Sequence, residues 1–310
     1  MSKLKGTKIS KILNKKRIYS LIYFEKNHSL DNTILVAGTG RSGTTWLAEI
    51  LTNFIKYRII FEPFNPRKVK ICKDLLNKQY LPPEVKNDEY FALFNKILAG
   101  KIRDLWVNQD NRIFRPQGRI IKTIRASLFL KWLKINFPTI PIIYILRHPC
   151  AVVESRLRLN WETIDVDIFL KQENLVKDLL YPFKNILSKA KTQIERNTCI
   201  WCVENLVAMN TMEPKDWCVI SYENLYQNPE MELKKINDYL AIDTQITNNL
   251  FKNNISLTIN KDSALLKKKN PIEAWKDKLS EDNINKILGI VEEFSLNTIY
   301  DKQFFPKKLF

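Results

Sequence analysis

Three of the seven glycines in this 310-residue chain fall within six consecutive positions, at Gly38, Gly40 and Gly43. Glycine adopts backbone conformations that other residues avoid, so the cluster predicts a tightly constrained turn. The β-rich run Thr33–Ala37 comes directly before it, and apolar residues recur at helical spacing over residues 46–55. The turn therefore joins a strand to a helix, where backbone N–H groups at the helix N-terminus can bind an anion.

Strand and helix patterns alternate along the rest of the chain. With 45% hydrophobic residues, the chain can bury a substantial core, and its length suits one large domain. Alternation of this kind predicts an α/β fold, in which a central parallel sheet carrying the phosphate-binding loop is flanked by helices. The four further strand candidates are Arg58–Ile60, Arg119–Thr123, Ile142–Leu146 and Trp217–Ser221.

The chain is predicted to consist of a basic N-terminal arm, residues 1–29, and a single domain, residues 30–310. A helical insertion is expected at about residues 62–118, because this stretch is far longer than a simple connection needs. Such insertions often cover a site. Further helices are expected over Asp165–Leu180 and Ile194–Asn210.

The chain is strongly basic. Fifty Lys and Arg residues against 33 Asp and Glu residues give a formal net charge of +17, which attracts anions of many kinds. Charge alone does not choose among nucleotides, nucleic acids, sulfated glycans and membrane surfaces. The basic arm is interpreted either as a solvated segment or as a peripheral contact with an anionic membrane surface.

The chain shows no pattern of a secreted or membrane-spanning protein. The apolar run Ile18–Phe24 lacks a signal-peptide cleavage pattern, and no run approaches the roughly 20 apolar residues that cross a bilayer. Five cysteines, an odd number, argue against a disulfide framework. Cys199 and Cys202 are interpreted as two thiols one turn apart in a core helix. We therefore predict a soluble cytoplasmic protein without a metal site.

The residues of the glycine-rich turn distinguish it from the common nucleotide-triphosphate loop. That loop ends in Gly-Lys-Ser/Thr, with the lysine on the terminal phosphates and the hydroxyl on magnesium. Here Thr44 stands in the lysine position, and the cation lies earlier, at Arg41. A kinase or hydrolase that uses ATP or GTP is therefore the weaker alternative. A non-catalytic protein that binds nucleic acid or another anion is the second alternative.

Two motifs resemble those of the PAPS-dependent sulfotransferases, including the carbohydrate-directed and bacterial members, where PAPS is 3′-phosphoadenosine-5′-phosphosulfate. The loop Arg41-Ser42-Gly43-Thr44-Thr45-Trp46 is similar to their 5′-phosphosulfate loop. The segment Tyr144–Pro149, with Arg147 after a strand and Ser155 eight residues later, resembles their 3′-phosphate motif. The resemblance implies that these residues bind the donor, and the spacing allows Arg147 and Ser155 to converge on one anion.

Weaker similarities extend over roughly residues 33–280. Trp201–Asn205, Ser221–Leu225 and Trp275–Leu279 resemble later stretches of the family in the same order. Lys268 and Lys269 lie where relatives close a basic loop over the 3′-phosphate. The usual arginine-lysine-glycine pattern is absent there, so a solvated charge run is an equal interpretation.

The resemblance also suggests a general base. Many members use a histidine, but this chain has only His28 and His148, and His148 belongs to the second motif. Other members place a glutamate soon after the loop helix, as at Glu62 here. Burial would raise the pKa of Glu62 and a nearby Arg41 would lower it, and a structural pairing with an arginine is the other interpretation. Lys122 matches a basic position of some carbohydrate-directed members.

These observations predict an in-line transfer of a sulfonate group from PAPS to an acceptor hydroxyl. Glu62 would take the hydroxyl proton, Arg41 and Lys122 would stabilise the developing charge, and 3′-phosphoadenosine-5′-phosphate (PAP) would leave. The acceptor is expected to be a small molecule or glycan, with a carbohydrate or glycolipid favoured and nucleic acid not expected. Trp106 and Trp161 could stack on such an acceptor or serve core packing alone.

Overall fold

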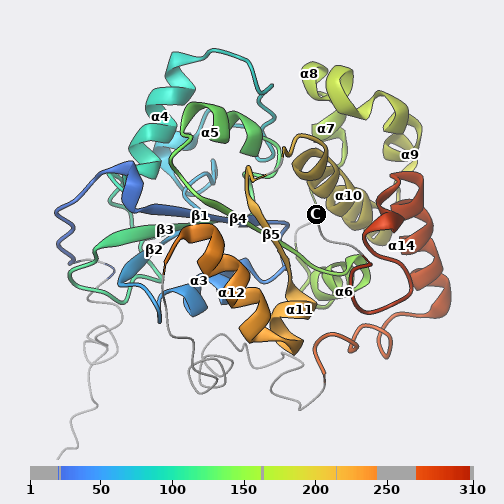
Figure 1. Cartoon of the computed structure of the whole chain (residues 1–310). Coiled ribbons are helices and arrows are strands. Elements are labelled where there is room, and N and C mark those ends of the chain that lie inside the picture. Colours follow the sequence, from blue (N-terminus) through green and yellow to red (C-terminus); the bar gives the residue numbers. More distant parts are fainter. Residues whose placement is uncertain (1–19, 21, 162–163, 214, 243–269, 308–310) are drawn as a thin grey trace, which may run out of the picture.

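The computed structural model describes residues 20, 22–161, 164–213, 215–242 and 270–307. At its centre lies a five-stranded parallel sheet with the order β2-β3-β1-β4-β5 (Figure 1). Each strand agrees with a predicted run to within one residue at either end, so the predicted α/β fold is confirmed. The strands are β1 (Thr33–Gly38), β2 (Tyr57–Phe61), β3 (Gly118–Thr123), β4 (Ile142–Leu146) and β5 (Cys218–Ser221).

Helices cover both faces of the sheet. On one face lie α3 and α12, and on the other lie α4, α5 and α10 (Figure 1). The α-helices are α3 (Thr44–Leu51), α4 (Asp88–Leu98), α5 (Leu130–Asn136), α6 (Pro149–Arg158), α7 (Asp167–Leu170), α8 (Glu173–Leu175), α9 (Lys184–Lys189), α10 (Gln193–Asn210), α11 (Tyr222–Gln227), α12 (Pro229–Leu240) and α14 (Glu281–Glu293). Shorter turns are the 3-10 segments Leu30–Asn32, Lys70–Cys72, Tyr181–Phe183 and Leu296–Thr298 and the π-helical segment Val176–Leu180.

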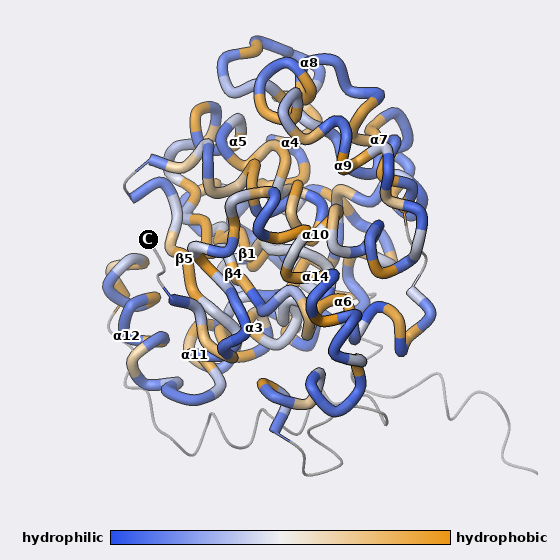
Figure 2. Tube along the Cα trace, turned by 90° about the vertical axis from the view of Figure 1, so that its right-hand side faces the viewer, coloured by the Kyte–Doolittle hydropathy of each residue, from blue (hydrophilic) through white to orange (hydrophobic). Residues whose placement is uncertain are grey.

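Strands β1 and β4 are largely apolar on both faces because helices bury both. In β1, Leu35 packs into the cluster beneath α4, α5 and α10, whereas its neighbour Val36 packs into the cluster beneath α3 and α12. Successive side chains of a strand point to opposite faces, so a continuous apolar run is what a doubly covered strand requires. Figure 2 shows the same distribution, with hydrophobic segments inside and hydrophilic segments at the periphery.

The predicted helix over Ile194–Asn210 is confirmed as α10. It begins with a capping box in which the Thr192 hydroxyl accepts from the Glu195 backbone N–H while the Glu195 carboxylate accepts from the Thr192 N–H. Among the described residues, neither α10 nor any other helix is long and apolar enough to cross a membrane.

The predicted helix over Asp165–Leu180 is wrong, because the structure breaks it into α7, α8 and the π-helical segment. The break lies at Gln172, whose backbone is extended. Its side-chain amide donates to the Lys78 carbonyl at 2.8 Å and accepts from the Tyr80 N–H at 2.7 Å. These side-chain contacts tie Gln172 to a distant loop, and an amphipathic pattern does not reveal them.

Part of the segment assigned to the N-terminal arm packs against the sheet. The Glu25 carboxylate lies between Arg58 and Arg119, at 2.8 Å from the Nε atom of each, and all three side chains are buried. The packed body of the described chain therefore begins before Leu30, and residues 1–19 lie outside the described part. Within the segment at about 62–118, the structure contains α4 and the 3-10 turn at Lys70–Cys72, and the rest is turns and irregular backbone.

Candidate active site

The glycine-rich loop leaves the carboxyl end of β1, between β3 and β4, and leads directly into α3. A Cβ on Gly38 would lie 2.5 Å from the Ile145 carbonyl oxygen, so only glycine allows β1 and β4 to approach here. Gly43 has φ of 102° and a Cβ there would lie 2.7 Å from the Tyr222 ring. The loop therefore sits at the strand ends where open α/β folds bind ligands.

The backbone of the loop is fixed on both sides of Arg41, which has a φ of 78° despite carrying a side chain. Arg156 donates through Nε and Nη2 to the Gly40 carbonyl at 3.2 and 3.1 Å. Arg147 donates through Nη1 to the Arg41 carbonyl at 3.1 Å. Because two arginines, the buried Arg156 and the partly buried Arg147, hold the adjacent carbonyl groups, this left-handed conformation is stabilised from outside the loop.

The backbone N–H groups of the loop differ in whether they already have a hydrogen-bond acceptor. The Ser42 N–H and hydroxyl both bind the Thr39 carbonyl, at 3.1 and 2.7 Å, so this amide is engaged within the loop. Thr44 is buried and Thr45 is partly exposed, and both belong to the first turn of α3. First-turn N–H groups have no acceptor within their own helix, so those of Thr44 and Thr45 suit an anion.

The two predicted donor-binding motifs meet in space. Arg41 donates through Nε to the Ser155 hydroxyl at 3.0 Å, and its guanidinium lies 5.6 Å from the Trp161 ring. Burial, and then the neighbouring Arg147, Arg158 and Arg156, lowers the pKa of Arg41 to about 10. The structure thus gathers cations where an anion would relieve their repulsion.

Arg147, at the end of β4, is the most constrained of these cations. Its guanidinium lies 4.0 Å from the centre of the Tyr222 ring, and its Nη2 donates to the Pro271 carbonyl at 3.3 Å. Its Nε is buried and has no hydrogen-bond partner within the described part of the chain. A buried charged donor without an acceptor is costly, so this atom points to a ligand.

Glu62 lies at the carboxyl end of β2 with a φ of 43°, a strained conformation for this residue. Its buried carboxylate accepts from Lys122 at 2.6 Å, from Arg125 at 2.7 Å and from the Ile124 N–H at 3.1 and 3.2 Å. Burial favours a higher pKa, but Lys122 and Arg125 hold the pKa of Glu62 below its usual value of 4.5. The cations that lower the pKa of Glu62 are therefore Lys122 and Arg125, and not Arg41 as the sequence suggested.

His148 does not compete with Glu62 as a base. Its Nδ1 accepts from the Cys150 N–H at 3.2 Å, its Nε2 bonds the Asp301 carbonyl at 2.9 Å, and its ring stacks on Trp275. Burial lowers the pKa of His148 to about 4. The imidazole is thus a neutral cap for α6. The other histidine, His28, bonds the Ala99 carbonyl at the opposite edge of the sheet.

Two further predictions concern donor contacts. Trp46 is buried on α3, with ring centroids 5.1 Å from Tyr222 and 6.5 Å from Tyr226, so the structure gives it a packing role beneath the loop. Its contact with the donor stays a prediction. Lys268 and Lys269 lie outside the described residues. Among the residues that are described, no group of His, Cys, Asp and Glu side chains is arranged to hold a metal ion.

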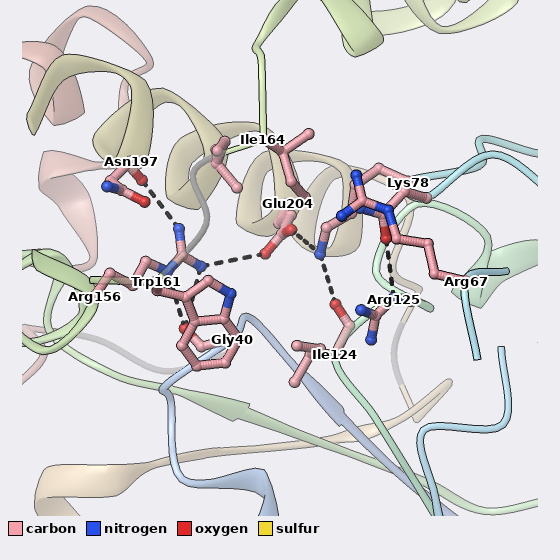
Figure 3. Close-up of a pocket in the computed structure, with 12 residues that line it drawn as sticks. Gly40, Arg67, Lys78, Ile124, Arg125, Arg156, Trp161, Ile164, Asn197 and Glu204 are labelled. Carbon is pink, nitrogen blue, oxygen red and sulfur yellow. Dashed lines mark hydrogen bonds and ion pairs between the residues drawn. The ribbon is translucent and has the colours of Figure 1, made fainter. Parts of the chain in front are cut away.

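A second charged network, which the sequence did not predict, lines a pocket beside the loop (Figure 3). Glu204 of α10 is fully buried, forms an ion pair with Lys78 and lies 3.9 Å from Arg156. Lys78 also donates to the Ile124 carbonyl at 2.7 Å, next to the Glu62 site. Glu204 lies within the Trp201–Asn205 segment that resembles the family, but nothing in the sequence marked Lys78, Arg125 or Arg156.

Comparison with known proteins gives a family match. A family model described as "Sulfotransferase family" matches residues 33–245. No curated protein sequence matches the chain. Three similar solved structures are a sulfotransferase domain from the curacin biosynthetic pathway, one from the Synechococcus PCC 7002 olefin synthase, and the mouse sulfotransferase SULT7A1 complexed with PAP.

These structures are distant in sequence. The curacin pathway domain is 18% identical, with 84% of this chain and 96% of that chain covered and a TM-score of 0.46. The olefin synthase domain is 19% identical, with coverage of 88% and 96% and a TM-score of 0.46. The mouse protein is 15% identical, with coverage of 86% and 85% and a TM-score of 0.48. The family match spans all five strands and both donor motifs, and by that match the chain belongs to the sulfotransferase family.

Proposed function

We propose that the protein transfers a sulfonate group from PAPS to a hydroxyl group of a carbohydrate or glycolipid. The observation that carries this proposal is the convergence of Arg41, Ser155 and Arg147 at the carboxyl ends of β1 and β4. PAPS carries anionic groups at both ends of its ribose, and a phosphate-binding loop next to a second arginine and serine matches that distribution. Arg147 Nε supplies a buried donor for such an anion.

Each of the proposed site residues has its own role in the reaction. The acceptor oxygen attacks sulfur in line with the bond to the 5′-phosphate oxygen, that bond breaks with its electron pair on the phosphate, and PAP leaves. Glu62 takes the acceptor proton, and its pKa below 4.5 keeps it ionised at neutral pH. Arg41 and the first-turn amides of α3 face the charge that develops on the leaving phosphate. Lys122, 2.6 Å from Glu62, holds the carboxylate and balances its charge.

A transfer assay with radiolabelled PAPS and a panel of sugars, glycolipids and phenols tests the proposal. Labelled product from a sugar or glycolipid, together with binding of PAP that is much tighter than binding of ADP without magnesium, supports it. Comparable weak binding of PAP and ADP would favour a nucleotide kinase or hydrolase. Strongly salt-dependent binding to nucleic acid without transfer would favour the non-catalytic alternative.

The Glu62→Gln variant tests the base. We expect kcat to fall by about 10²- to 10⁴-fold, the range for removal of a general base, while PAP still binds. The glutamine leaves Lys122 and Arg125 without their carboxylate, so a thermal melt must accompany the assay. The matched control is Glu292→Gln, an exposed carboxylate near the end of α14, which should leave kcat unchanged. Full activity of Glu62→Gln would show that another group takes the proton.

The proposal includes a cytoplasmic location and, through the basic segment before Ser20, peripheral contact with an anionic membrane surface. Seven cations between Lys3 and Arg17 support the contact. Sedimentation with vesicles that contain or lack phosphatidylserine tests it, and equal sedimentation with both would contradict it.

A further inference from the structure

A chain of side-chain contacts joins the two halves of the proposed site along the pocket beside the loop. Its members all line that pocket and follow one another in the order Gly40, Arg156, Glu204, Lys78 and Ile124 (Figure 3). Gly40 belongs to the phosphate-binding loop. Ile124 follows β3 and binds Glu62 through its N–H. The chain of contacts therefore runs from the donor loop to the proposed base.

Both ends of this chain of contacts are backbone carbonyl groups held by a buried cation. Arg156 donates to the Gly40 carbonyl at 3.2 and 3.1 Å, and Lys78 donates to the Ile124 carbonyl at 2.7 Å. A Cβ on Gly40 would lie 3.3 Å from Cδ1 of Ile124, so the loop and the end of β3 are closely packed. A displaced cation would therefore displace the donor loop or the segment that binds Glu62.

Glu204 is the group that the two cations share. Its carboxylate is fully buried, forms an ion pair with Lys78 and lies 3.9 Å from the Nη2 of Arg156. Burial lowers the pKa of Lys78 and of Arg156, and the Glu204 carboxylate opposes this lowering in both. One carboxylate thus stabilises the charged form of both cations.

Stability alone does not account for this network. Removal of three charged groups from water is expensive, and apolar residues of similar volume often stabilise a core as well or better. The contacts of the two cations give a different reason for their presence. They end on the two carbonyl groups that border the proposed donor site and the proposed base.

We propose that Glu204 is a positioning residue that sets the distance between the phosphate-binding loop and Glu62. It acts on the loop through Arg156 and on the base through Lys78, and it takes no proton itself. The inference rests on the proposed function, which assigns the loop to the sulfonate donor and Glu62 to the acceptor proton. An in-line transfer depends on this distance, since a misplacement of about 1 Å can lower the rate about 100-fold.

Hydrogen exchange of the Glu204→Gln variant tests the positioning without any ligand. Glutamine keeps the shape of the side chain and removes its charge. Mass spectrometry follows peptides that cover residues 38–47 and 120–126, which contain the bonded N–H groups of Ser42 and Ile124. We expect exchange in both to be about tenfold faster, beyond any change over residues 218–221 of β5.

The matched control for hydrogen exchange is Glu25→Gln. Glu25 is also a buried carboxylate between two cations, Arg58 and Arg119, but it lies away from the loop. Its replacement removes the same charge and the same kind of ion pair. It should therefore produce no selective change over residues 38–47 and 120–126.

Two functional measurements follow the donor and the base separately. For Glu204→Gln we expect PAP affinity, measured by calorimetry, and kcat each to fall by about tenfold, as for one weakened charge-assisted hydrogen bond. The value of kcat is measured with radiolabelled PAPS and the sugar, glycolipid or phenol that is sulfonated. A positioning role predicts a loss in both, because the carboxylate acts on both sides of the site.

The double variant Lys78→Met/Glu204→Gln separates positioning from stability. It removes both partners of the buried ion pair, so its melting temperature should return toward that of the wild type. We expect kcat to stay at least about tenfold low, because the Ile124 carbonyl still lacks its donor. If Glu204→Gln does not fold, hydrogen exchange and kcat of the double variant decide the inference.

Three results would overturn the inference. The first is wild-type exchange, PAP affinity and kcat in Glu204→Gln. The second is a double variant whose kcat returns together with its melting temperature, since the carboxylate would then serve stability alone. The third is the same selective exchange in Glu25→Gln. If the wild-type protein neither binds PAP nor transfers sulfonate, the proposed function fails, and hydrogen exchange still decides whether Glu204 positions the two segments.

Discussion

Replacing Arg147 with alanine should remove most of the affinity for PAP. The buried Nε has no acceptor within the described chain, and Nη1 and Nη2 hold the carbonyls of Arg41 and Pro271. A hydrogen bond to a charged group contributes about 1.5–3 kcal/mol. The one unpaired donor, Nε, therefore accounts for about 1.5–3 kcal/mol of PAP binding. Because each 1.4 kcal/mol is a factor of ten, we expect PAP affinity to fall at least about tenfold.

The same substitution should have little effect on the stability of the ligand-free protein. Among the neighbouring cations, Arg147 contributes most to the lowered pKa of Arg41, so its removal relieves repulsion. Alanine also loses two hydrogen bonds to carbonyl groups and the contact with the Tyr222 ring, which act in the opposite direction. These effects oppose each other, and we expect the free energy of unfolding to change by no more than about 1–2 kcal/mol.

Calorimetric titration with PAP and chemical denaturation of the same samples measure the two quantities. Arg115→Ala is the matched control, because it removes an exposed arginine at the opposite edge of the sheet. A loss of PAP affinity smaller than about fivefold for Arg147→Ala would refute the reasoning. An equal loss for Arg115→Ala would also refute it, since the overall charge would then account for the affinity.

Two other predictions follow from the buried carboxylates. Because Lys122 and Arg125 lower the pKa of Glu62, the ionised base is present above pH 4.5 and is lost only at lower pH. The value of kcat/KM should therefore be constant from about pH 5.5 to 7.5. A decrease in kcat/KM on the acid side, centred near pH 6.5, would contradict the assignment of Glu62 as the base. Replacing Glu25 with glutamine leaves the two buried arginines beside it unpaired, so the free energy of unfolding should fall by about 3–5 kcal/mol while PAP affinity stays within about twofold. Urea denaturation measures this decrease, and a decrease of less than about 1 kcal/mol would show that the pairing of Glu25 with Arg58 and Arg119 contributes little to stability.

The sheet and the phosphate-binding loop were predictable because their signals are local. Each strand contains a short run of apolar, mostly β-branched residues, and Gly38 and Gly43 are required by close contacts of the turn with Ile145 and Tyr222. The proximity of the two donor motifs was also predictable from the sequence, because the carboxyl ends of parallel strands lie at one edge of the sheet. Arg41 and Ser155 are 114 residues apart and still form a hydrogen bond.

The charged partners around the site were not predictable, since they are chosen by packing between distant segments. Lys78 and Glu204 are separated by 126 positions, and both are buried. Neither periodicity nor composition indicates that such residues pair. The same limit explains why the sequence placed Glu25 in the basic N-terminal arm and did not reveal its pairing with Arg58 and Arg119.

The carboxylates of Glu62 and Glu204 are connected through one peptide segment, which couples the pocket beside the loop to the proposed base. The Ile124 N–H donates to Glu62, and the Ile124 carbonyl accepts from Lys78, the partner of Glu204. A change in the charge of Glu204 would shift Lys78 and thereby the strand end that holds Glu62. An anion that competed for the Arg125 guanidinium would act on Glu62 more directly, because Arg125 is one of the two cations that hold the pKa of this carboxyl below its usual value. Such an anion should therefore weaken the ion pair and raise the pKa of Glu62.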